Sequence, residues 1–119
     1  MNSSLLGVGA INGAIAVAAG AFGAHALKER LSERALAVFE TAARYQMYHA
    51  LAIVLCAVVA GNLAGARVSG WLFTAGIVVF SGSLYALALS DVKVLGAITP
   101  FGGVMFLAGW VWLAVSALR

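Results

Sequence analysis

The side chains best suited to chemistry lie around the start of the second long apolar stretch of the chain. They are His25, Glu40, Arg44, Gln46 and His49. Glu40 and Arg44 are four residues apart, the spacing that brings opposite charges together on one face of a helix. Gln46 and His49 are three residues apart, so both side chains can face one neighbouring helix. We predict that these residues form a polar cluster at one end of the fold.

Two imidazoles and a carboxylate suggest proton transfer or metal binding. His25 and His49 are expected on adjacent helices at similar depth, and histidine titrates near neutral pH, so a proton relay through them and Glu40 is chemically feasible. Helical zinc motifs place two ligands one turn apart, as in H-E-x-x-H, and that spacing is absent here. We therefore predict no metal site, no cofactor and no catalytic residue. The favoured interpretation is structural, with hydrogen bonds of the cluster holding the fold together.

A second group of polar side chains is isolated within apolar sequence. Its members are Asn12, Ser81, Ser83 and Tyr85. Within lipid, each such residue is a functional hypothesis by default, but its commonest role is a hydrogen bond between helices. The sequence around the two serines lacks the G-x-S-x-G pattern, and no Gly-rich phosphate loop with its lysine is present. Nucleophilic catalysis therefore has little support.

Four long apolar stretches without Lys, Arg, Asp or Glu must position these residues. They are residues 5–27, 45–66, 68–90 and 94–118. A charge-free apolar run of about 18 residues or more is typical of a transmembrane helix. The composition agrees, with 64% hydrophobic and 9% charged residues, against about 45–50% and about 25% in soluble domains. We predict an all-α integral membrane bundle of four transmembrane helices, a single domain over 1–119.

The expected spans are about 5–27, 45–60, 68–90 and 100–118. The fourth is shortened because Thr99-Pro100 fits a helix start, with Thr as N-cap and Pro in the first turn. Residues 94–98 then form an apolar turn. An amphipathic segment over about 29–44 is predicted to lie in the membrane interface, with Ser32 as its N-cap. Because no Gly or Pro interrupts residues 33–60, it is expected to run straight into the second span.

The first apolar run is rich in small residues. Gly9 and Gly13 form a GxxxG pair, and Gly20 continues the row. Small residues let helix backbones approach closely in lipid, so we predict packing within the bundle, with a homo-oligomer interface as the alternative. Ala24-His25-Ala26 has the form of a signal-peptidase site, but no basic residue precedes the run, so we expect a retained span.

Basic residues predict the orientation. Of the seven in the chain, five fall in the first and third connections or beside them, and only Arg67 and Arg119 lie on the other side. The positive-inside rule then places both termini outside the cytoplasm. The basic residues do not cluster with aromatic partners as in nucleic-acid-binding domains. A single cysteine, Cys56, allows no disulfide within the chain.

Four blocks of the sequence resemble a known family. They are residues 20–28 (GAFGAHALK), 39–52 (FETAARYQMYHALA), 80–85 (FSGSLY) and 95–103 (LGAITPFGG), followed by Gly109-Trp110. The chain resembles the domain of unknown function 423 family, the YgdD-like small inner-membrane proteins, to which the transmembrane protein 256 family is related. The resemblance covers nearly the whole chain. It implies a small four-span protein of the bacterial inner membrane and implies no activity, cofactor or catalytic residue.

These observations favour a small polytopic membrane protein of unknown function, non-enzymatic, with a structural, lipid-binding or partner-binding role. Membrane lipids are the expected partners, and no nucleic acid is expected. The sequence leaves open whether the chain forms a homo-oligomer. One alternative is an oligomeric transporter or channel for a small solute or proton, which requires a hydrated cavity reaching His25, His49 or Thr99, or a pore between copies. A second alternative, an intramembrane enzyme using His25 and His49, requires these side chains to lie within hydrogen-bond reach of each other, of a water or of a ligand.

Overall fold

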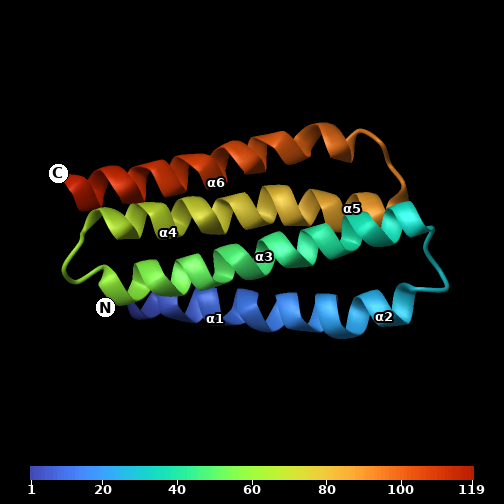
Figure 1. The fold of residues 1–119 in the computed structure, drawn as a ribbon, viewed down its shortest axis with the longest axis horizontal. Helices are drawn as coiled ribbons and strands as arrows, with labels where there is room; N and C mark the ends of the chain where they lie inside the picture. The colour runs from blue at the N-terminus through green and yellow to red at the C-terminus, as the bar shows by residue number, and fades with distance from the viewer.

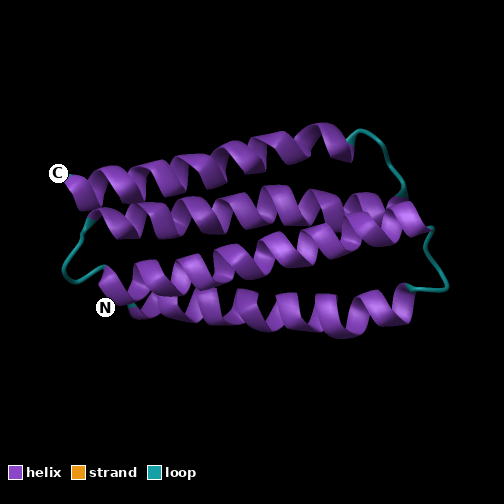
Figure 2. Ribbon diagram, viewed as in Figure 1, coloured by secondary structure: helices purple, strands orange, loops and turns teal.

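The computed structural model describes all residues, Met1–Arg119, and every regular element is a helix. Four helical rods lie side by side, each antiparallel to the next (Figure 1), and short loops join their ends (Figure 2). The first rod comprises α1 (Ser3–Val17), the π-helical η1 (Ala18–Gly23) and α2 (Ala24–Leu27), and the second is α3 (Glu33–Val59). The third comprises α4 (Gly65–Gly76), the π-helical η2 (Ile77–Ser81) and α5 (Gly82–Ser90), and the fourth is α6 (Leu95–Leu118).

All four rods are long and apolar enough to cross a membrane. The molecule measures 48 × 26 × 18 Å, so its long axis exceeds a hydrocarbon core of about 30 Å. Only 28 of the 119 residues are buried, and large apolar side chains such as Phe22, Phe101 and Leu107 are exposed along the rods. An exterior of this kind requires lipid as its solvent. The prediction of an all-α membrane protein with four spanning helices is confirmed.

The charged segment runs without a break into the second span, as predicted, but it begins at Glu33 and not at residue 29. Residues 28–32 form the first connection, and Glu33–Arg44 are the first turns of α3. Ser32 caps α3 as expected, with its hydroxyl oxygen accepting a 3.1 Å hydrogen bond from the Ala35 amide. The helix continues unbroken to Val59 because no Gly or Pro stops it. It stays in the bundle because Phe39 is buried with Ala24 of α2 and Ala88 of α5.

The start of the last helix was also predicted wrongly. α6 begins at Leu95, and Pro100 lies inside it, so residues 95–98 are helical and not a turn. The amides of Leu95, Gly96 and Ala97 close the first turn by bonding carbonyls three residues back. Pro100 lacks the N–H that would have bonded the Gly96 carbonyl, and its ring crowds that carbonyl. Transmembrane helices tolerate such a loss when neighbouring groups adjust around it.

The core lies at the middle and at the end of the molecule that holds both termini. Its largest fully buried apolar side chains are those of Leu5, Ile53, Cys56 and Phe73. Glycines let α6 approach the third rod: a Cβ added to Gly109 would lie 2.8 Å from Phe73 Cδ1, and one on Gly76 would lie 2.6 Å from Phe106 Cε1. Close approach of this kind replaces the hydrophobic effect as the source of helix association in lipid.

The small residues of the first rod do not behave alike. A Cβ on Gly9 would lie 2.8 Å from Val54 Cγ2 and 3.1 Å from the Ala50 carbonyl oxygen, so α1 packs tightly on α3 there. Gly13 has nothing within 4 Å of such a Cβ, which contradicts the packing role predicted for it within one chain. At Gly20 the nearest atom is Ala43 Cβ at 3.5 Å. The two rods are thus close at Gly9 and more loosely packed toward Gly20.

Candidate functional site

A chain of hydrogen bonds crosses three helices near the middle of the molecule. The Tyr85 hydroxyl of α5 donates to Gln46 Oε1 of α3 over 2.8 Å. Gln46 Nε2 donates to Asn12 Oδ1 of α1 over 3.0 Å, and Asn12 Nδ2 donates to the Val8 carbonyl over 2.9 Å. Gln46 is only 4% exposed. The chain satisfies polar groups that lipid cannot, and it ties α1, α3 and α5 together at one depth.

His49 has both ring nitrogens occupied. Nδ1 lies 2.8 Å from the Tyr45 carbonyl oxygen, which can only accept, so Nδ1 carries the proton. Nε2 then accepts a 3.1 Å hydrogen bond from the indole N–H of Trp110 on α6. The ring is stacked on Phe106, with centroids 3.5 Å apart and planes 5° from parallel. His49 is therefore a fixed neutral imidazole with no free lone pair for a metal or a proton.

The two histidines do not meet. His25 lies in α2, next to Ala24, which packs with Phe39 of α3. His49 is ten residues beyond Phe39 on the same helix, a rise of about 15 Å. His25 is exposed and borders a hollow whose other lining residues all come from the first connection and its approach, Ala26, Lys28, Glu29 and Arg30. The hypotheses of an enzyme and of a relay using both imidazoles lose their geometric basis.

The predicted polar cluster therefore separates into distinct parts. Gln46 and His49 face the interior, whereas Glu40 and Arg44 are exposed on α3. The structure contains no ion pair between those two charges, although their spacing allows one. The reason for the split is helical periodicity: residues 46 and 49 share the buried stripe of α3 with Phe39, Ala42 and Ile53, and residues 40 and 44 do not.

Ser81 and Ser83 each join two helices. Ser81 Oγ donates to the Ala42 carbonyl over 2.8 Å, and Ser83 Oγ lies 2.6 Å from Thr99 Oγ1 of α6. Thr99 thus serves as a partner within a helix and not as the predicted N-cap at a turn before Pro100. No surface hollow is lined by His49 or Thr99. Of the three residues named for the transporter alternative, only His25 borders a hollow, the one at the first connection.

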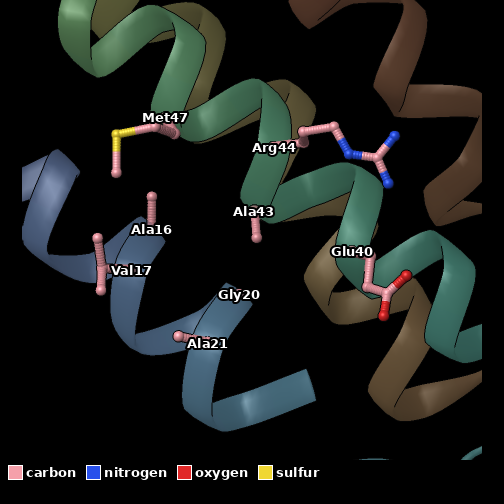
Figure 3. Close-up of a pocket in the computed structure, with 8 residues that line it drawn as sticks. All are labelled: Ala16, Val17, Gly20, Ala21, Glu40, Ala43, Arg44 and Met47. Atoms are coloured by element: carbon pink, nitrogen blue, oxygen red, sulfur yellow. The ribbon is translucent and has the colours of Figure 1, made fainter. Parts of the chain in front are cut away.

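A shallow groove of about 410 Å³ lies where α1 and η1 diverge from α3. Figure 3 shows small residues of both rods facing each other across it, with Glu40 and Arg44 leaving α3 one turn apart and Arg44 extending away from the first rod. Its lining consists of Ala16, Val17, Gly20, Ala21, Glu40, Ala43, Arg44 and Met47. Two of the residues predicted for the polar cluster are therefore brought together here, on the outer face of the molecule.

Comparison with known proteins identifies the family. A family described as a protein of unknown function, DUF423, matches residues 19–103. The chain belongs to this family. It is 48% identical over 113 residues to a UPF0382 membrane protein of Staphylococcus aureus, covering 94% of this chain and 93% of the relative. It is 46% identical over 115 residues to the UPF0382 membrane protein YwdK of Bacillus subtilis, covering 94% of each. No solved structure matches the chain.

As a DUF423 protein, the chain is an integral membrane protein of a family whose function is unknown, as its sequence resemblance implied. The matched region, residues 19–103, contains most of the groove lining and all of α3. Sequence reasoning found Glu40 and Arg44 but missed Ala43 and Met47 as groove residues. The sequence does show small residues in the first rod and charged residues at the start of α3. That pattern alone does not predict which pair of helices leaves a groove between them.

Proposed function

We propose that this DUF423 protein is a non-enzymatic binding protein of the membrane, which holds the acyl chain of a phospholipid in the groove between the first rod and α3. The observation that carries the proposal is the groove itself. It is about 410 Å³ in volume, opens on the outer face of the molecule and has a floor of small apolar residues. A flexible hydrocarbon chain fills such a surface and gains the dispersion contacts that the separated helices do not make with each other.

The interior of the molecule supports the same proposal. Gln46, Tyr85 and Asn12 satisfy one another, and His49 is held between Tyr45 and Trp110. These groups are engaged in joining helices, so their chemistry is structural. The outer groove combines an apolar floor with two charged side chains, Glu40 and Arg44, that form no ion pair within the chain.

We further propose that the protein resides in the bacterial cytoplasmic membrane with both termini outside the cytoplasm. The chain termini lie at the same end of the molecule (Figure 1). The connections at residues 28–32 and 91–94 lie at the other end, with Lys28, Arg30 and Lys93 among them. Basic residues favour the cytoplasmic side, so this end, and with it the groove, belongs to the cytoplasmic leaflet.

The test of acyl-chain binding is native mass spectrometry of the full-length protein released from lipid vesicles. We expect retained phospholipid on the unmodified protein and loss of most of it in Gly20→Leu, because the leucine side chain would occupy the groove. Gly7→Leu is the matched control, since Gly7 is exposed with nothing within 4 Å and does not line the groove. Equal lipid retention in both variants would refute the proposal.

A further inference from the structure

The two charges of the groove lie at an unusual depth. Ala42, between them on α3, accepts a hydrogen bond from Ser81. Ser81 is nine residues from Ser90, the last residue of α5, a distance of about 13 Å along the helix. Glu40 and Arg44 therefore lie well below the end of the apolar third rod. Charged side chains at such depth are costly unless they are paired or reach the interface.

No group of the chain compensates these charges. The only ion pair in the structure joins Lys93 to Asp91 in the third connection. Glu40 and Arg44 are both exposed, one helical turn apart, on the lipid-facing side of α3. Neither charge has an ion-pair partner within the chain, and a ligand that offers a positive group to Glu40 and a negative group to Arg44 would compensate both.

We propose that the groove recognises a zwitterionic phospholipid with a primary ammonium headgroup, with Arg44 on its phosphate and Glu40 on its ammonium. This assignment rests on the proposed function and specifies the lipid. A guanidinium matches phosphate oxygens with two parallel N–H donors. A primary ammonium has N–H groups to donate to a carboxylate, whereas a quaternary ammonium has none.

The order of the charges along α3 agrees with the order of charges in that headgroup. Glu40 is nearer the helix start and the connecting loops, and Arg44 is one turn deeper, with Met47 beyond it. In such a lipid the ammonium is the outermost group, the phosphate joins the glycerol beneath it, and the acyl chains follow. The deeper apolar part of the groove, between Met47 and Val17, then receives an acyl chain.

A second copy of the chain fits the same surface less well. A two-fold axis that passes through the groove would place groove against groove. Two facing hollows leave a void, which forfeits the contacts that drive association in lipid. A lipid fills the hollow and neutralises both charges at once.

The experiment measures headgroup preference on the full-length protein in detergent by native mass spectrometry. Phosphatidylethanolamine, phosphatidylcholine and phosphatidylglycerol with identical acyl chains are titrated separately. We expect the first to bind about tenfold more tightly than the other two, the effect of one charge-assisted hydrogen bond. Glu40→Gln should reduce phosphatidylethanolamine binding to the level of phosphatidylglycerol, and Arg44→Gln should weaken binding of both.

Matched variants keep this test independent of folding. Glu33→Gln and Arg67→Gln remove exposed charges that do not line the groove and should change no affinity. The double exchange Glu40→Arg with Arg44→Glu preserves net charge and should abolish the preference, because it inverts the order of charges. Helical circular dichroism and thermal unfolding of each variant verify that the fold is retained.

Each other outcome overturns the assignment in a different way. Equal binding of the three lipids, lost in Gly20→Leu, would refute the headgroup assignment and leave acyl-chain binding intact. Absence of bound lipid from the unmodified protein would refute both. A headgroup preference unchanged by Glu40→Gln and Arg44→Gln would place the lipid elsewhere. Dimers lost in those two variants, without lipid preference, would assign the surface to a second copy.

Discussion

Gln46 is the residue on which the interior hydrogen-bond chain depends, because its amide both accepts from Tyr85 and donates to Asn12. Replacing it with methionine, of similar shape, should lower stability by about 1 kcal/mol, since interhelical hydrogen bonds in membranes average about 0.6 kcal/mol each. Tyr85→Phe removes only one bond. A double-mutant cycle of Gln46→Met and Tyr85→Phe, followed by unfolding in mixed micelles, should show a coupling of about 0.6 kcal/mol. If the stability losses of the two single variants simply add up in the double variant, the hydrogen bond between Tyr85 and Gln46 is contradicted.

His49 provides a spectroscopic prediction at the same scale. The Tyr45 carbonyl fixes the proton on Nδ1, and Trp110 donates to Nε2. Nitrogen-15 spectra of histidine-labelled protein should therefore show a protonated Nδ1 and an unprotonated Nε2. Trp110→Phe should shift the Nε2 resonance and leave Nδ1 protonated. The opposite tautomer in the unmodified protein would show that the ring is held differently.

Individual residues could be predicted from the sequence only in part. Gln46 and His49 were singled out because polar groups are rare in apolar sequence, and hydrogen bonding between helices was the favoured role for Asn12, Ser81, Ser83 and Tyr85. Their partners were not predicted. Trp110 lies sixty-one positions from His49, and which residues of two helices meet depends on relative depth and rotation, which no local pattern encodes.

At the scale of elements, the third rod and α6 are held together by glycines. A Cβ on Gly102 would lie 2.7 Å from the Phe80 Cα, which is backbone and cannot move aside. Gly102→Ala should destabilise the protein by about 1–3 kcal/mol, as overpacking does. Gly103→Ala is the control one residue away, where the nearest atom is Phe80 Cδ2 at 4.0 Å. The melting temperature of Gly102→Ala should lie clearly below that of Gly103→Ala. Equal melting temperatures would contradict the close contact between Gly102 and the Phe80 backbone.

Pro100 tests where the last helix begins. Inside α6, Pro100→Ala restores an N–H that can bond the Gly96 carbonyl, so stability should rise, by at most about 3 kcal/mol. A helix that started at Pro100 would instead lose its preorganised first turn and become less stable. The sign of the change in melting temperature distinguishes the two. The sequence suggested the wrong start because Thr-Pro is a strong local signal, whereas tolerance of proline in lipid depends on the surroundings.

The spans themselves were easier to predict than their ends. The thickness of the bilayer sets how long a charge-free apolar run must be to cross it, so four such runs predict four spanning helices. The ends depend on caps and on contacts. α3 begins at Glu33 because Ser32 caps it and Phe39 is buried, and an amphipathic pattern alone did not distinguish these first turns from an interfacial helix.

For the whole molecule, orientation is the main open prediction, and cysteine labelling tests it. Cys56 is fully buried and should not react. In intact cells, a cysteine placed at Ser3 should react with a membrane-impermeant maleimide, and one placed at Ser32 should react only after the cells are opened. The structure places these two positions at opposite ends of the first rod and its connection. The reverse pattern would invert the topology and move the groove to the outer leaflet.

The four rods form an open row, with the first rod and α6 at its edges (Figure 1). The buried share of their most apolar stretch is 17% and 22%, against 50% and 39% for the two inner rods. Each rod after the first packs on the one made just before it, so during synthesis each of these spans finds a docking surface already in the bilayer. A nascent chain halted after two or three spans therefore already holds packed neighbours.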